Sequence, residues 1–146
     1  MKTFKRVLVP TDFSEHAERA LKLGECLARQ NDAELLLLHV LEDARSATEL
    51  SLTPPTEPTD RKLLGAADDK LKHLADRSLP EALEWRTFVS IGHPAAKIVD
   101  VADNEGVDLI CMGTLGRTGL KHLLVGSIAE KVVRHANCAV MTVKHS

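Results

Sequence analysis

The chain has 146 residues, of which 44% are hydrophobic and 27% are charged, proportions typical of one soluble globular domain spanning residues 1–146. Aromatic residues make up only 3% and the formal net charge is −2. These values disfavour the stacking platforms of single-strand readers and the basic surface that a DNA backbone requires, so we expect no nucleic-acid partner.

The sequence also argues against secretion and membrane insertion. The apolar stretch after the basic N-terminus is short, and the longest aliphatic run covers only residues 35–38, whereas a membrane helix needs about 20 residues. Three widely separated cysteines, Cys26, Cys111 and Cys138, form neither a disulfide framework nor a C-x-x-C metal site. We therefore expect a cytoplasmic protein with no membrane partner.

Strand-like and helix-like patterns alternate from the N-terminus. A strand is expected at residues 6–10 and a helix at about 14–30, followed by a strand at 33–40 and a helix at about 60–78. The second strand is apolar on both faces, as a strand between two layers of helices must be. The segment 41–59 contains three prolines among polar residues, which predicts a long, mobile loop.

The alternation continues to the C-terminus. Strands are expected at 84–91, 108–112 and 139–144, with a helix that has Pro94 near its first position and another at 127–135. Repeated βα units predict an α/β fold, a three-layer sandwich around a five-stranded parallel sheet. By analogy with doubly wound folds, we expect the strand order 3-2-1-4-5.

Two segments are candidates for a ligand site because each follows a predicted strand. In open α/β sheets, ligands bind outside the carboxyl ends of the strands, where the strand order reverses. Pro10, Thr11 and Asp12 follow the first strand, and the segment from Gly113 to Ser127 follows the fourth. In the assumed order these strands are neighbours, so we expect the two segments to face each other.

The second segment is rich in glycine and locally cationic. It contains Arg117 and Lys121 but no Asp or Glu, and it holds four of the eight glycines, namely Gly113, Gly116, Gly119 and Gly126. Glycine allows backbone amides to approach an anion closely. Gly126 and Ser127 also open a predicted helix, whose first amides and dipole favour negative charge. The pattern predicts phosphate binding.

Each of these features also has a purely structural explanation. Ser127 and Glu130 form the S-x-x-E pattern of a capping box, so Ser127 could serve only as a helix cap. Asp12 could be the N-cap of the helix that follows it, and the glycines could serve only to reverse the chain. The combination of glycines, cations and a helix start at a strand exit favours the phosphate hypothesis.

Common nucleotide motifs are missing from the segment. It contains no Walker A loop and no G-x-G-x-x-G dinucleotide motif. None of the four aromatic residues lies in it, which disfavours a flavin site of the flavodoxin kind.

The spacing Gly113-x2-Gly116-x9-Gly126-Ser127 resembles the ATP-binding branch of the universal stress protein family. The opening VLVPTDFSEHAERAL, the strand-end pair His39-Val40 and the turn Gly92-His93-Pro94 are similar to that family as well. The resemblance covers nearly the whole chain except residues 41–59. One departure is Leu115, where family members often carry histidine.

The resemblance implies a Rossmann-like fold of the adenine nucleotide alpha hydrolase-like type that binds ATP, or AMP or ADP. By position, the residues against adenine and ribose would be Pro10, Thr11 and Asp12, with the backbone of Val40 at the adenine edge. Those around ribose and phosphates would be Gly113, Thr114, Gly116, Arg117 and Gly119, and those holding the phosphates would be Gly126, Ser127 and Ile128. A Mg²⁺ or Mn²⁺ ion would be held mainly by phosphate oxygens, because the loop has no carboxylate.

Binding is favoured over catalysis. An ATP hydrolase needs a group that orients water or accepts a proton at the γ-phosphate. Asp12 is assigned to the other end of the nucleotide, and His122 is interpreted as an exposed loop residue. We therefore favour a stress-response or signalling protein in which bound nucleotide regulates dimer or partner interactions. The alternatives are a slow ATP hydrolase or phosphotransferase, and a dimeric scaffold with a vestigial site.

The last predicted strand, residues 139–144, indicates how two copies would associate. In the assumed order it is an edge strand, and its side chains are largely apolar, with no proline or inward charge to block pairing. We therefore expect a homodimer through the strand from Ala139 to Lys144. The alternative is that another segment covers this edge.

Overall fold

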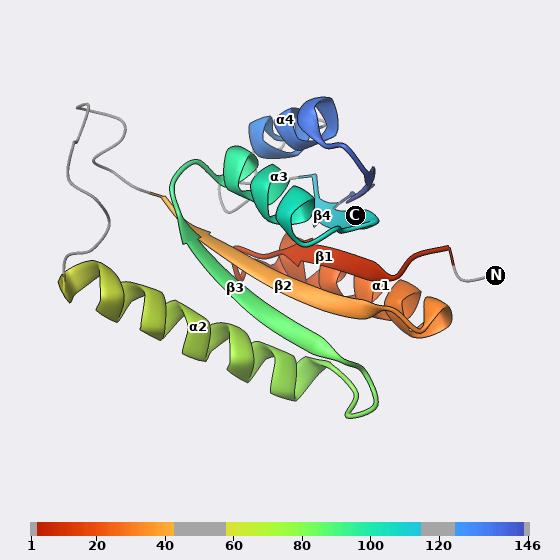
Figure 1. Ribbon diagram of the computed structural model, residues 1–146, viewed down its shortest axis with the longest axis horizontal. Coiled ribbons are helices and arrows are strands. Elements are labelled where there is room, and N and C mark those ends of the chain that lie inside the picture. Colours follow the sequence, from red (N-terminus) through yellow and green to blue (C-terminus); the bar gives the residue numbers. More distant parts are fainter. Residues whose placement is uncertain (1–2, 43–57, 115–124, 145–146) are drawn as a thin grey trace.

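Five parallel strands form one sheet in the order β3-β2-β1-β4-β5 (Figure 1). The structure is a computed structural model that describes residues 3–42, 58–114 and 125–144. The strands are β1 (Arg6–Pro10), β2 (Glu34–Leu41), β3 (Trp85–Ile91), β4 (Leu109–Gly113) and β5 (Ala139–Val143). The predicted fold class and strand order are confirmed.

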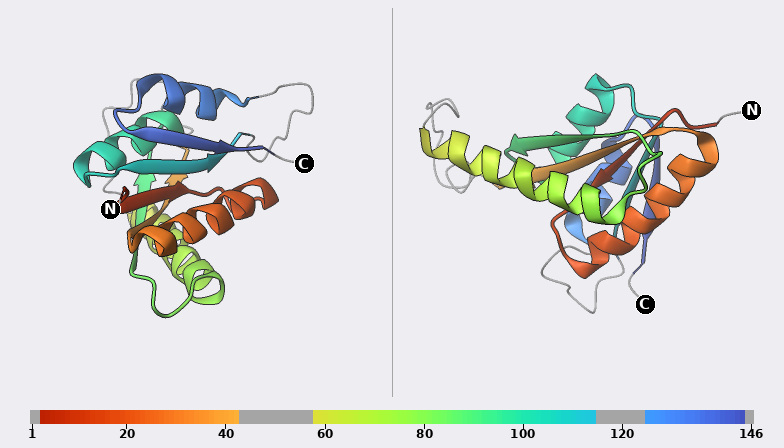
Figure 2. Two further views of the ribbon diagram at one scale, coloured as in Figure 1. Left: turned by 90° about the vertical axis from the view of Figure 1, so that its right-hand side faces the viewer. Right: turned by 90° about the horizontal axis from the view of Figure 1, so that it is seen from below.

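Helices cover both faces of the sheet. They are α1 (Glu15–Asn31), α2 (Pro58–Ser78), α3 (Pro94–Asn104) and α4 (Ser127–His135). Figure 2 shows α1 and α2 on one side of the strands and α3 and α4 on the other. No helix within the described ranges combines the length and apolarity needed to cross a bilayer.

Each face of the sheet has its own apolar core, because successive side chains of a strand point to opposite faces. The core under α1 and α2 includes Val7, Val9, Leu35, Leu37 and Leu71. The core under α3 and α4 includes Leu8, Leu36, Leu38, Ile98 and Val132. The continuous apolar run of β2 therefore supplies both cores, as predicted for a central strand.

The element boundaries differ slightly from those predicted. Gly113 is the last residue of β4 instead of the first residue of the following loop. Leu41 belongs to β2, and α2 already begins at Pro58. The rest of the predicted loop, residues 43–57, lies outside the described residues.

The N-cap of α1 is Ser14, so the alternative in which Asp12 caps this helix is wrong. The Ser14 hydroxyl accepts a hydrogen bond from the Ala17 amide at 3.3 Å. Asp12 lies two residues earlier, where its carboxylate accepts a hydrogen bond from the Ser14 amide at 3.0 Å. Asp12 therefore shapes the turn that leads into the helix.

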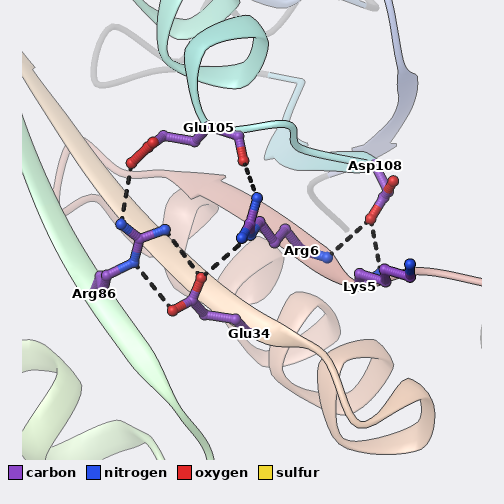
Figure 3. A network of polar contacts seen from close by, with 6 residues as sticks. All are labelled: Lys5, Arg6, Glu34, Arg86, Glu105 and Asp108. Atoms are coloured by element: carbon purple, nitrogen blue, oxygen red, sulfur yellow. Dashed lines mark hydrogen bonds and ion pairs between the residues drawn. The ribbon is translucent and has the colours of Figure 1, made fainter.

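A network of charged groups joins the amino ends of the strands (Figure 3). The Arg86 guanidinium donates two 3.0 Å bonds to Glu34 and one of 3.1 Å to Glu105, and the Glu34 carboxylate raises the pKa of Arg86. Arg6 donates to the Glu105 carbonyl at 2.8 Å, and Asp108 accepts from the Lys5 and Arg6 amides. An open polar depression of about 510 Å³ lies beside this network, at the edge of the sheet opposite the predicted ligand site.

Candidate functional site

The carboxyl ends of β1, β2 and β4 meet at one edge of the sheet. β1 pairs in parallel with β2 on one side and with β4 on the other. The segment after Pro10 and the segment after Gly113 therefore leave neighbouring strands at the same edge. This is the adjacency on which the sequence-based prediction of the site depends.

The β1–α1 turn, residues 11–14, has a tightly held backbone. Thr11 is 7% exposed, and its amide donates to the Leu38 carbonyl at 2.8 Å. Its hydroxyl accepts from the Phe13 amide at 3.0 Å. Phe13 has a φ of 66°, a left-handed conformation that is uncommon for a bulky residue and is often found at functional sites. Local hydrogen bonds thus stabilise a strained turn beside the strand end.

Side chains from β2 and α2 complete the contacts of this turn. His39 Nδ1 lies 2.8 Å from the Thr11 carbonyl oxygen, and its ring centroid lies 4.8 Å from that of Phe13. From α2, Lys70 Nζ lies 4.2 Å from the centroid of the Phe13 ring. Sequence analysis did not assign His39 or Lys70 to the site. The available signal for His39 was a polar residue directly after the apolar run 35–38.

Val40 lies just beyond the last paired residue of β1. The β1–β2 register ends at Pro10 opposite Leu38, and main-chain groups of alternate strand residues face the same neighbour. Because the Leu38 carbonyl faces β1 and the Leu41 carbonyl faces β3, the amide and carbonyl of Val40 face the β1 side. They lie past the point where β1 turns away, beyond the last β1 partner.

The fourth strand and the last helix are joined through Thr114. This residue is 4% exposed, and its amide donates to the Val143 carbonyl at 3.1 Å. Its own carbonyl accepts a 2.6 Å bond from the Gly126 amide. The start of α4 is therefore attached to the exit of β4. The predicted residues Gly116, Arg117 and Gly119, together with Leu115, Lys121 and His122, lie outside the described residues.

The start of α4 differs from the capping box considered above. Gly126 is the N-cap and makes no side-chain cap bond, whereas Ser127 is the first helical residue and is exposed. The alternative in which Ser127 only caps the helix is therefore wrong. The first amides of a helix have no acceptor within the helix and carry its positive dipole end, so this helix start suits an anionic ligand.

The described residues at this edge form no side-chain metal site. Among the residues the structure describes, no group of three or more His, Cys, Asp or Glu side chains could hold a metal ion. The Asp12 carboxylate already accepts the Ser14 amide. The start of α4 offers main-chain amides and the Ser127 hydroxyl to a ligand.

Comparison with known proteins gives the family. The model of the universal stress protein family matches residues 3–144. The chain belongs to this family. The resemblance seen in the glycine spacing is confirmed.

Relatives of this universal stress protein match over nearly their full length. MJ0577 from Methanocaldococcus jannaschii is 31% identical over 154 residues, covering 97% of this chain and 95% of that protein. The solved structure of MJ0577 superimposes with a TM-score of 0.82 at 34% identity, covering 99% of this chain and 98% of the other. UspA from Lactobacillus plantarum gives a TM-score of 0.77 at 30% identity, covering 95% and 97%.

Two more distant structures share the fold and contain nucleotides. A universal stress protein in complex with cAMP has a TM-score of 0.63 at 22% identity, covering 99% of both chains. The universal stress protein from Archaeoglobus fulgidus in complex with dAMP has a TM-score of 0.60 at 23% identity, covering 99% of this chain and 100% of that one.

Proposed function

We propose that this universal stress protein binds an adenine nucleotide, ATP in the first instance, at the carboxyl edge of its sheet. The observation that carries the proposal is the start of α4, which has no side-chain cap and is attached by the Thr114–Gly126 bond to the exit of β4. A helix start of this kind binds phosphate through its amides and dipole. The base and ribose then lie toward β1 and β2.

The proposed contacts are those that the family resemblance implies for this edge of the sheet. The β1–α1 turn contributes Pro10, Thr11 and Asp12 to the adenine and ribose, and Val40 offers its main chain to the adenine edge. The β4 exit and the loop after it contribute Gly113, Thr114, Gly116, Arg117 and Gly119 to the ribose and phosphates. The phosphates are held by Gly126, Ser127 and Ile128.

Two further observations support an adenine nucleotide as the ligand. Proteins with this fold have been solved with cAMP and with dAMP, so the fold accommodates an adenosine monophosphate. The loop after β4 has no acidic side chain and carries two cations, which favours more than one phosphate. AMP and ADP are the competing ligands in the binding test. A Mg²⁺ or Mn²⁺ ion would be held mainly by phosphate oxygens, because the loop after β4 has no carboxylate.

The proposed role is regulation by nucleotide occupancy, with hydrolysis absent or slow. The protein is proposed to act as a homodimer in the cytoplasm, in stress response or signalling, through pairing of β5 with its copy. In the sheet β5 is an edge strand, and its unpaired main-chain groups are a template for another strand. Nucleotide binding would then change which partners the dimer contacts.

The test is to denature the purified protein and identify the released small molecules by chromatography and mass spectrometry. The proposal predicts an adenine nucleotide in near-stoichiometric amount, or saturable ATP binding if the protein is purified empty. Absence of both would contradict it. Release of ADP over many turnovers from added ATP would favour the hydrolase alternative instead.

A further inference from the structure

The main-chain pairing of β1 with β2 ends at Thr11, although β2 continues to Leu41. The Thr11 amide donates to the Leu38 carbonyl at 2.8 Å, and in a parallel ladder the next bond would run from the Val40 amide to the Thr11 carbonyl. The register instead ends at Pro10 opposite Leu38. The ladder therefore ends at Thr11, where the chain turns toward α1.

The Thr11 carbonyl, which this rung would use, accepts a hydrogen bond from the side chain of His39 instead. His39 Nδ1 lies 2.8 Å from the Thr11 carbonyl oxygen. A carbonyl oxygen only accepts hydrogen bonds, so Nδ1 carries the hydrogen and donates it. His39 lies between Leu38 and Val40, and strand side chains alternate between faces, so its ring is on the face covered by α1 and α2. The Thr11 carbonyl thus accepts from a side chain on this face of the sheet and not from the Val40 amide.

Other contacts keep the His39 ring in this position. Its centroid lies 4.8 Å from that of the Phe13 ring. Lys70 Nζ lies 4.2 Å from the centroid of the Phe13 ring. The left-handed φ of Phe13, 66°, places this aromatic side chain against the histidine. Because the Phe13 amide also donates to the Thr11 hydroxyl, the turn and the histidine hold each other in one arrangement.

We propose that His39 is a positioning residue for recognition of the adenine base: by donating to the Thr11 carbonyl it ends the β1–β2 ladder and keeps the Val40 main chain available to the ligand. Without this donor, the Thr11 carbonyl turns into the plane of the sheet and accepts a hydrogen bond from the Val40 amide. The base then loses a main-chain hydrogen bond, while the phosphate contacts at α4 stay intact. This inference rests on the proposed nucleotide site.

Two substitutions of nearly equal shape separate the effect of the hydrogen-bond donor from the effect of side-chain volume. In His39→Asn the amide nitrogen is as many bonds from the backbone as Nδ1 is, so it donates to the same carbonyl. His39→Leu branches at the same atom but donates nothing. His39→Phe keeps a ring against Phe13 and also lacks the donor, and it takes the place of His39→Leu if that variant does not fold.

Calorimetric titration of the full chain with ATP and, separately, with inorganic tripolyphosphate measures the two ends of the site. We expect His39→Leu to weaken ATP binding about tenfold, the effect of one lost hydrogen bond, and to leave tripolyphosphate binding unchanged. His39→Asn should bind ATP within about twofold of the wild type. In NMR exchange experiments, the Val40 amide should exchange more slowly in His39→Leu than in the wild type or in His39→Asn.

The titrations distinguish failure of the His39 inference from failure of the proposed function. If the wild type binds ATP and His39→Leu binds it equally well, the inference is overturned and the proposed function stands. Equal loss of ATP and tripolyphosphate, or no recovery in His39→Asn, would show a general structural role and would also overturn it. If the folded wild type binds no nucleotide, the proposed function and the inference both fall.

Discussion

Gly24 lies where α1 comes nearest to the sheet. A Cβ atom added at this position would lie 2.6 Å from Val9 Cγ2 and 3.6 Å from Cys111 Cβ. β-branched Val9 belongs to β1 and is fully buried, so it has little freedom to move. This glycine allows the helix to pack closely against β1 and β4.

Gly24→Ala should therefore destabilise the protein by about 1–3 kcal/mol, the usual cost of overpacking a core, although alanine is the better helix former. Gly65→Ala is the matched control, because nothing lies within 4 Å of a Cβ added there in α2. That substitution should stabilise the protein by about 1 kcal/mol through helix propensity. Urea unfolding of both variants measures the difference, and equal effects would contradict the packing argument.

The Cys111 thiol is another buried group of this core. Burial raises the pKa of Cys111 to about 11 from its ordinary value of 9.0, and the thiol donates weakly to the Ala20 carbonyl at 3.4 Å. The unfolded chain therefore loses this proton at a lower pH than the folded protein does. The contribution of the neutral thiol to the free energy of unfolding is fully present below about pH 9 and is lost as the pH rises to about 11.

Comparison with Cys111→Ala isolates this contribution from other groups that titrate in the same range. The difference in unfolding free energy between wild type and variant should shift by about 2–3 kcal/mol between pH 8 and pH 11 in favour of the variant. Urea unfolding across this range measures it. Parallel pH profiles for the two proteins would refute the assignment.

At the scale of elements, the starts of α1 and α4 differ in a way that bears on function. The Ser14 hydroxyl caps α1 by accepting the Ala17 amide, whereas Ser127 is the first residue inside α4 and makes no cap bond. The same residue type thus has a structural role at one helix start and is proposed to bind phosphate at the other.

Ser14→Ala should lower the unfolding free energy by about 1 kcal/mol, as loss of an N-cap does. Ser127→Ala should leave it within about 0.5 kcal/mol but weaken ATP binding about tenfold, because a hydrogen bond to a charged phosphate is lost. Thermal unfolding and calorimetric titration together separate the two roles. A large loss of stability in Ser127→Ala, with unchanged affinity, would restore the capping explanation.

Sequence patterns predicted these elements well where local chemistry decides the structure. The apolar run of β2 and the Pro94 start of α3 depend on residues close in sequence, and both are confirmed. Local patterns could not separate Asp12 from Ser14 as the cap of α1, because either residue type can accept the first amides. The strand order could be assumed only by analogy, since it depends on contacts between distant segments.

Side-chain contacts between segments distant in sequence could not be predicted from the sequence. His39 and Thr11 are 28 residues apart and Arg86 and Glu34 are 52 apart, and no local pattern couples such pairs. The position of the candidate site at the carboxyl edge follows from topology alone, so it could be predicted. The residue contacts that shape that edge required the structure.

At the scale of the whole molecule, the two ends of the sheet differ in chemistry. At the amino edge, the charged groups of Arg6, Arg86, Glu34 and Glu105 pair with one another or with main-chain groups. The carboxyl edge presents main-chain amides at the end of β2 and at the start of α4. The proposed division is therefore that one end stabilises the fold and the other binds the ligand.

The β5 edge should mediate dimerisation, and its hydrogen-bonding pattern indicates which residue to change. The Val143 carbonyl accepts from Thr114, so Val143 faces β4, and the amide of the preceding residue, Thr142, faces outward. Thr142→Pro removes this outward donor and leaves the β4–β5 ladder intact. In light scattering we expect twice the chain mass for the wild type and for the control Thr142→Ala, and one chain mass for Thr142→Pro. A dimer that survives the proline would exclude β5 pairing.

The central claim is that the carboxyl edge binds ATP, and calorimetric titration of the wild type and of the double variant Gly116→Val, Gly126→Val tests it most directly. Gly126 has a φ of −70°, which any residue adopts, so valine there blocks the approach of phosphate without straining the backbone. The account predicts saturable ATP binding by the wild type and none by the double variant, whose circular dichroism and unfolding midpoint stay close to those of the wild type. A folded double variant that binds ATP with wild-type affinity would contradict it.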